Sequence, residues 1–159
     1  MIRMIAACAR NRVMGKDGTL PWNIRADWDY FLETTQSGVL LMGRRCYEDF
    51  TGYAQSRPVV VLSRDPTKKF PHSHRAGSLK EGIETASKLR DNVWICGGAS
   101  IYEEAMPLAK ELFLTQIDAD FEGDVKFPSW HQHFAREISR KEITSDGYRL
   151  TFSVLAKQA

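Results

Sequence analysis

Short runs of consecutive apolar residues recur along the chain and are separated by polar segments that carry glycine or proline. A continuous apolar run of this kind is typical of a strand buried on both faces of a parallel sheet. Four such runs occupy residues 39–42, 59–62, 93–96 and 112–115, and residues 2–9 form a further strand-like segment. The pattern therefore predicts a mainly parallel sheet.

Segments with helical spacing lie between these runs. A helix is predicted over residues 24–35, because one face of it would carry Ile24, Trp28, Phe31, Leu32 and Thr35. A second helix is indicated by the spacing of Leu79, Ile83, Ala86 and Leu89. Shorter helices are expected at residues 46–50 and 100–106, whereas residues 10–23 contain three helix breakers and are expected to form a long loop.

The C-terminal segment has a different pattern. Apolar and polar side chains alternate over residues 148–154, which predicts an antiparallel strand after a turn at Asp146-Gly147, with residues 138–143 as its partner. Taken together, the elements predict one α/β domain over residues 1–159, with a central, mainly parallel twisted sheet, an antiparallel C-terminal edge strand and flanking helices. In such sheets ligands bind beyond the carboxyl ends of the strands.

Composition narrows the class of protein. The 159 residues suffice for one substantial core, and a formal net charge of +2 is too small to indicate a nucleic-acid partner or an acidic membrane surface. No apolar run approaches the roughly 18 residues of a membrane span. The three cysteines, Cys8, Cys46 and Cys96, show no paired spacing, which favours a reducing compartment, the cytoplasm. We expect a monomer.

The ends of three predicted strands carry residues suited to phosphate. Gly43-Arg44-Arg45, Ser63-Arg64 and Gly97-Gly98 follow the runs at 39–42, 59–62 and 93–96, and the first and third lead into helices. Helix N-termini attract anions, glycine allows close approach to the backbone, and arginine forks match phosphate oxygens. A ligand with a diphosphate and a separate phosphate fits this set, and NADPH is such a ligand. Neither of the common nucleotide-binding glycine motifs is present.

Two acids in the segment LPWNIRADWDYFLE are expected to differ in role. Asp29 shares a face with Arg25, four residues earlier, which is typical of a solvated ion pair. Asp27 points into the edge of the apolar stripe, where an unpaired carboxylate is costly. Asp27 is therefore a candidate site residue; the alternative is that it caps a loop or pairs with a buried arginine.

The chain resembles dihydrofolate reductase over nearly all of its length. The stretches that carry the resemblance are MIAACARNRVMG, LPWNIRADWDYF, VLLMGRRCYE, RPVVVLSRD, WICGGASIYEEAMP, LFLTQIDADFEGDVKFP and GYRLTFSVL, in the family's order and spacing. The resemblance implies NADPH-dependent reduction of 7,8-dihydrofolate to tetrahydrofolate, with binding of antifolate-type molecules.

The resemblance also implies roles in catalysis and substrate binding. Asp27 would orient the pterin and assist its protonation, Thr115 would hydrogen-bond Asp27 and the pterin amine, and Tyr102 would stabilise charge at the nicotinamide. Trp22 and Leu20 would lie on the inner side of a loop, residues 13–22, that closes over the nicotinamide. The remaining substrate contacts would come from Ile5, Ala6, Trp28, Phe31, Phe50 and Arg57.

For the cofactor, the resemblance implies a cis peptide at Gly97-Gly98 and a 2′-phosphate site at Arg45 and Arg64. The other implied cofactor-binding residues are Ala7, Val13, Met14, Gly15, Leu20, Gly43, Arg44, Cys46, Leu62, Ser63, Ala99, Ser100, Ile101 and Tyr102. Plainer interpretations remain for several substrate-site residues. Thr115 would be an ordinary β-branched strand residue, Arg57 would be solvated, and the aromatic residues Trp28, Phe31 and Phe50 would be part of the core.

Some features depart from the family pattern. Ala54 would leave the wall of the site thin beside the benzoyl ring of dihydrofolate unless Tyr53 turns inward. Trp28 would narrow the substrate pocket.

Alternative functions are a pyrimidine reductase of riboflavin synthesis, a non-catalytic ligand-binding relative, and an RNA-binding protein. A metal site at His72/His74 or His131/His133 is disfavoured, because both pairs lie in polar stretches without further ligands nearby.

Overall fold

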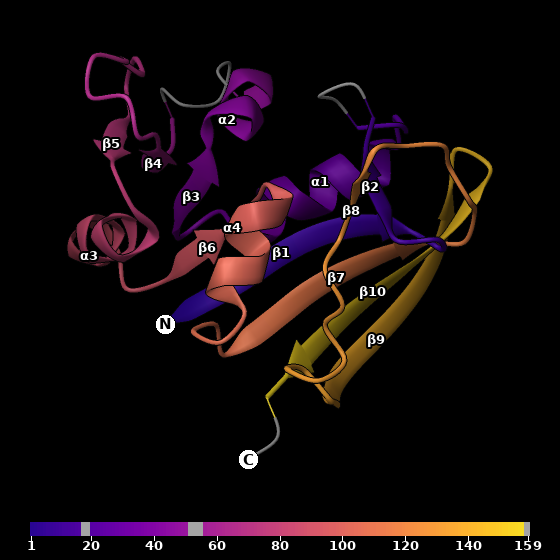
Figure 1. Ribbon diagram of the computed structural model, residues 1–159. Coiled ribbons are helices and arrows are strands. Elements are labelled where there is room, and N and C mark those ends of the chain that lie inside the picture. The colour runs from indigo at the N-terminus through magenta and orange to yellow at the C-terminus, as the bar shows by residue number, and fades with distance from the viewer. Residues whose placement is uncertain (17–19, 51–55, 158–159) are drawn as a thin grey trace.

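A twisted eight-stranded sheet runs through the centre of the protein (Figure 1). The structure is a computed structural model and describes residues 1–16, 20–50 and 56–157. Its strand order is β5-β4-β3-β6-β1-β7-β10-β9. The strands are β1 (Ile2–Ala9), β3 (Val39–Gly43), β4 (Val59–Leu62), β5 (His74–Ala76), β6 (Val93–Ile95), β7 (Glu111–Ile117), β9 (Arg136–Ser145) and β10 (Tyr148–Ala156). The first six strands in this order, β5, β4, β3, β6, β1 and β7, pair in parallel. The β9–β10 hairpin forms the predicted antiparallel C-terminal edge.

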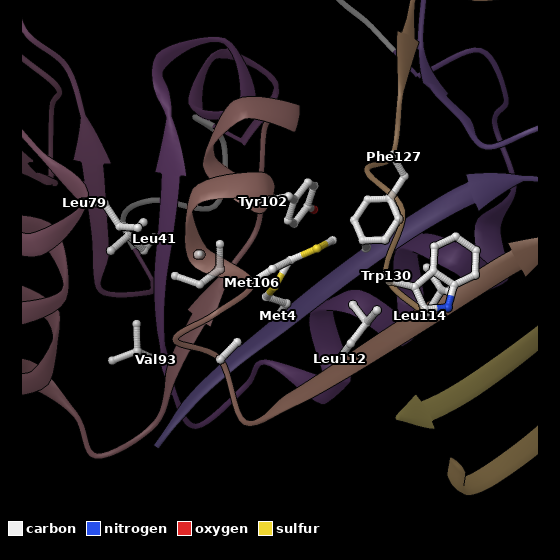
Figure 2. Packing of buried hydrophobic residues seen from close by; sticks show 14 of the residues in the cluster. Met4, Leu41, Leu79, Val93, Tyr102, Met106, Leu112, Leu114, Phe127 and Trp130 are labelled. Atoms are coloured by element: carbon white, nitrogen blue, oxygen red, sulfur yellow. The ribbon is translucent and has the colours of Figure 1, made fainter. Parts of the chain in front are cut away.

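Helices cover both faces of the sheet because successive residues of each buried strand point to opposite sides. They are α1 (Arg25–Thr34), α2 (Arg44–Phe50), α3 (Leu79–Leu89) and α4 (Ala99–Ala105). On β3, Leu40 and Met42 pack in the cluster that contains α1 and α2 residues. Val39 and Leu41 pack on the other side with α3 and α4 residues. Figure 2 shows Leu41, Leu79 and Tyr102 among the residues of this cluster. The predicted α/β architecture is confirmed.

The three strand ends singled out from the sequence are neighbours. Strands β4, β3 and β6 are adjacent in the sheet, with Gly43 opposite Leu62 in the register of β3 and β4. The Gly43 amide donates to the Gly97 carbonyl over 2.9 Å, which joins the end of β3 to the end of β6. Helix α2 begins directly after β3, and α4 begins after the Gly97-Gly98 turn that follows β6. Parallel pairing therefore brings the glycines and arginines to one edge of the sheet.

Two predictions about loops were incomplete. The segment predicted as a loop at residues 10–23 contains β2 (Val13–Gly15), which pairs antiparallel with β8 (Val125–Lys126). The short strand β5 was also missed. Strands of two or three residues are too short to show a periodic pattern, and the partner of β2 lies more than a hundred residues away along the chain. Their pairing depends on the tertiary fold.

The predicted C-terminal hairpin is confirmed and is longer than its apolar pattern indicated. Asp146 and Gly147 form the turn with φ of 54° and 82°, which matches a two-residue hairpin connection with positive φ at both positions. Strand β9 extends beyond the predicted residues 138–143 because it is the edge of the sheet, where polar side chains face solvent. Within the described part of the chain, no helix has the length and apolar character needed to cross a membrane.

Candidate active site

A cleft of about 610 Å³ opens at the carboxyl ends of the central strands, between α1, α2 and α4. This volume is within the range of small-molecule sites. The cleft brings together most of the predicted site residues: Ile5, Ala6, Ala7, Met14, Gly15, Leu20, Asp27, Trp28, Phe31, Gly43, Arg44, Arg45, Cys46, Phe50, Gly97, Gly98, Ala99, Ser100, Ile101, Tyr102 and Thr115.

Asp27 lies in the first turn of α1, partly buried at the wall of the cleft. Its Oδ2 accepts a hydrogen bond from Trp22 Nε1 over 3.1 Å. Burial raises the pKa of Asp27 to about 6, although the Trp22 hydrogen bond lowers it. Within residues 1–16, 20–50 and 56–157 no cation forms an ion pair with this carboxylate. The carboxylate is therefore available to a ligand.

Asp29 has the solvated environment predicted for it. Its carboxylate lies 3.6 Å from Arg25 Nε in an i,i+4 pair, with 61% of the Asp29 side chain exposed. The two acids differ because two residues turn a helix by about 200°, which places them on opposite faces. The distinction drawn from helical phase is confirmed.

An aromatic wall lies beside Asp27. The ring centroids of Trp28 and Phe31 are 5.5 Å apart, and the Phe50 ring lies 6.2 Å from Trp28 and 6.0 Å from Phe31. All three residues line the cleft, so their rings offer contact surface to a flat ligand as well as to one another. The residues expected to adjust this wall, Tyr53 and Ala54, lie outside the described part of the chain.

The opposite wall is built from the Gly97-Gly98 turn and α4. The predicted cis peptide between these glycines is present. A Cβ added at Gly98 would meet no protein atom within 4 Å, so the backbone is open to the cleft there. Tyr102 donates its hydroxyl to the Ile5 carbonyl over 2.7 Å, and burial raises its pKa well above the ordinary value. The phenol is therefore a neutral donor that ties α4 to β1.

Some predicted site residues lie outside the lining of the cleft: Val13, Trp22, Arg57, Leu62, Ser63 and Arg64. Trp22 reaches the site through its hydrogen bond to Asp27. Arg57 lies against the C-terminal end of α1. Leu62 is the last residue of β4 and pairs with Gly43 of β3, and Ser63 and Arg64 follow it. Thr115 is 2% exposed and lines the cleft, but among the described residues it makes no hydrogen bond to Asp27; Trp22 makes that contact instead.

Sequence reasoning missed six residues of the lining: Tyr30, Met42, Asp49, Cys96, Asp124 and Val125. Asp49 lies three residues after Cys46 and directly before Phe50, so the phase of α2 could have identified it. No local signal marks Asp124 and Val125, which reach the cleft through the pairing of β8 with β2. In the described residues, no cluster of three or more potential metal ligands is present.

The chain is similar to known proteins from end to end. A family model described as dihydrofolate reductase matches residues 1–157. Dihydrofolate reductase type 3 of Salmonella typhimurium is 34% identical over 161 residues, with 99% of each chain covered. Dihydrofolate reductase of Bacillus subtilis (strain 168) is 32% identical over 146 residues, covering 92% of this chain and 86% of the relative.

A solved structure supports the same relationship. Dihydrofolate reductase from Enterococcus faecalis, described as complexed with NADP(H) and RAB-propyl, has a TM-score of 0.91 and 26% identity, and the match covers 100% of this chain and 97% of that one. Since the family model and these relatives span nearly every residue, and the cleft contains the predicted acid between an aromatic wall and a glycine turn, the chain belongs to the dihydrofolate reductase family.

Proposed function

We propose that the protein reduces 7,8-dihydrofolate to 5,6,7,8-tetrahydrofolate with NADPH and so supplies one-carbon metabolism. The observation that carries the proposal is the environment of Asp27, a partly buried carboxylate without a cationic partner among the described residues, which faces a cleft with an aromatic wall. A carboxylate in this position suits the amino group and ring N–H of a pterin, because such donors replace the water that the acid has lost.

The pKa of Asp27 fits a role in protonation. A carboxyl group with a pKa of about 6 is partly protonated near neutral pH, so it can supply or relay a proton to the substrate ring. Trp22 holds Oδ2, which leaves Oδ1 for the ligand. Trp28, Phe31 and Phe50 would contact the pterin and benzoyl rings, and Thr115, Ile5 and Ala6 would line the pterin end.

The opposite wall fits the cofactor. NADPH supplies the hydride when bound, and the Enterococcus faecalis relative is described as a complex with NADP(H). At Gly98 the backbone is open to the cleft, and Arg44 and Arg45 are among the residues that line it. The neutral Tyr102 hydroxyl is directed to the Ile5 carbonyl. Arg45 and Arg64 are assigned to the 2′-phosphate. We also propose a cytoplasmic monomer that binds antifolate-type molecules.

The decisive assay is loss of NADPH absorbance on addition of dihydrofolate, with a dihydropterin that lacks the benzoylglutamate tail and a pyrimidine intermediate of riboflavin synthesis as comparisons. We expect turnover with dihydrofolate and none with the pyrimidine. Asp27→Asn should lower turnover by about 10²-fold or more at neutral pH, in line with general acid catalysis, while binding of NADPH is retained. Turnover of the pyrimidine alone would establish the alternative function.

A further inference from the structure

A second cavity, of about 360 Å³, lies on the other face of the sheet from the cleft. Neighbouring residues of β7 mark the division, because Thr115 lines the cleft and Gln116 lines the second cavity. Successive side chains of a strand point to opposite faces, so the sheet separates the two sites. Among the described residues, none lines both. The volume is at the lower end of the range for small-molecule sites.

The floor of the second cavity carries two polar side chains where the surrounding core is apolar. Ser153 of β10 is 3% exposed and pairs in register with Leu114 of β7, a member of the core cluster on this face. Gln116 lies two residues further along β7, on the same face. Within residues 1–16, 20–50 and 56–157 neither side chain has a hydrogen-bond partner. Buried polar groups of this kind are costly unless a partner reaches them.

Trp130 adds a third group without a partner. It is 7% exposed, belongs to the core cluster drawn in Figure 2, and is held between the rings of Phe127 and His131, at centroid distances of 5.7 and 4.3 Å. Its Nε1 donates to no described residue. In the described part of the chain, Ser73 Oγ is the only side-chain nitrogen or oxygen atom that is both sealed and unpartnered. The Ser153 hydroxyl and the Trp130 N–H, which also lack partners, are therefore open to the cavity that they line.

The charges at the rim of the second cavity are already paired. Arg140 lies 4.0 Å from a Glu137 carboxylate oxygen and 3.2 Å from one of Glu142. Arg140 and Glu137 both line the cavity. Because two carboxylates share this guanidinium, it has little attraction left for an anion, and the polar floor is neutral. The charge distribution therefore favours a neutral ligand.

We propose that the second cavity is a binding site for a small, neutral, planar molecule with a cyclic amide edge, the chemical class of the oxo-substituted nucleobases. The Gln116 amide both donates and accepts, so it can form two hydrogen bonds with such an edge, as glutamine does with the edge of a base. Ser153 can donate or accept, and Trp130 donates. Trp130 and Phe134, which also lines the cavity, offer aromatic contact to a flat ring. This site is independent of the reaction in the cleft.

Uracil is a suitable probe, because its planar, uncharged ring carries two carbonyl groups and two N–H groups. The chain has four tryptophans, so the indole N–H signals of the ¹⁵N-labelled full chain report on both sites, and Trp130→Phe identifies the Trp130 signal. We expect uracil to shift the signals of the Trp130 indole and the Gln116 side-chain amide saturably, with a Kd of about 1 mM, as suits a ligand of so few atoms. The Trp22 and Trp28 signals should not move.

Ser153→Ala should raise the Kd for uracil about 10-fold, the equivalent of roughly 1.4 kcal/mol. Ser139→Ala is the matched control: Ser139 pairs with Val154, the neighbour of Ser153, so its side chain lies on the other face and the Kd should not change. Gln116→Met replaces Ser153→Ala if the alanine variant does not fold, and the same rise is expected.

Benzoate, a planar anion, tests the charge of the ligand and should bind more weakly than uracil. Four results would each overturn the proposal. They are no saturable shift of the Trp130 signal up to about 10 mM uracil, shifts confined to the tryptophans of the cleft, an unchanged Kd in Ser153→Ala, and tighter binding of benzoate than of uracil.

Discussion

The indole Nε1 of Trp22 donates a hydrogen bond to Asp27 Oδ2 over 3.1 Å, across the junction between the loop before α1 and the first turn of that helix. Trp22 is only 7% exposed, and its ring packs against Phe121 with 5.5 Å between centroids. The donor is therefore held in place by the core and orients one oxygen of the acid. The hydrogen bond favours the charged carboxylate, whereas burial favours the protonated form.

Replacing Trp22 with phenylalanine should raise the pKa of Asp27 above its value of about 6, because the change removes the contact that lowers it. Hydrogen bonds to charged groups contribute roughly 1.5–3 kcal/mol, so we expect an upward shift of about one pKa unit. The pH profile of kcat/KM would report the shift. Trp130→Phe is a matched control, since Trp130 is also 7% exposed and lies in a different core cluster. An unchanged profile in Trp22→Phe would show that the contact does not tune the acid.

The raised pKa of Asp27 also predicts how stability depends on pH. The folded protein holds the Asp27 proton up to a pH of about 6, whereas the unfolded chain releases it near 3.8. Between these values the folded state binds more protons, so the contribution of Asp27 to the free energy of unfolding falls as pH rises. Above pH 6 the buried charge costs about 1–3 kcal/mol.

Asp27→Asn should therefore be more stable than the wild type at pH 7, by up to that amount, although it loses turnover. The advantage should shrink as pH falls and disappear below pH 4, where the acid is protonated in both states. Urea unfolding at several pH values measures both trends. Asp29→Asn is the control, because that solvated acid should give no such pH-dependent gain. A lower stability of Asp27→Asn at pH 7 would contradict the assigned burial.

How much of the site could be predicted depends on how far apart the interacting residues lie in the sequence. Asp27 was identified because helical phase is a local property of residues close in sequence, and the strand ends were identified because parallel strands order their carboxyl ends at one edge. The Trp22 hydrogen bond could not be predicted, since it depends on how a loop folds back against α1. The same holds for the β2–β8 pair, which brings Asp124 to the cleft from across the chain.

The arginines at the strand ends were both assigned to the cofactor, but the structure distinguishes them. Arg45 lines the cleft, whereas Arg64 lies beside it after β4. Neither forms an ion pair within the described residues, so each guanidinium is available to phosphate. Arg45→Ala should raise the Kd for NADPH about 10-fold, given roughly 1.5 kcal/mol for a charged hydrogen bond. We expect a smaller effect from Arg64→Ala.

The comparison with NADH makes the assignment specific. NADH lacks the 2′-phosphate, so its Kd should change less than two-fold in either variant. Fluorescence titration of both cofactors gives the ratio directly. Arg90→Ala, which removes an exposed arginine directly after α3, should leave both Kd values unchanged. Equal weakening of NADPH and NADH in Arg45→Ala would assign that arginine to a part of the cofactor other than the 2′-phosphate.

The two glycines after β6 should respond to alanine in opposite ways. At Gly98, φ is −84° and an added Cβ meets no protein atom within 4 Å, so alanine fits the fold but projects into the cleft. At Gly97, φ is +121° and the Cβ would lie 3.3 Å from the Tyr102 ring, so alanine is strained. Gly98→Ala should weaken NADPH binding at nearly wild-type Tm, and Gly97→Ala should lower Tm by several degrees, as a cost of about 1 kcal/mol or more implies. Calorimetry and cofactor titration of both variants separate the effects; full NADPH affinity in a folded Gly98→Ala would show that the cofactor does not pass over this backbone.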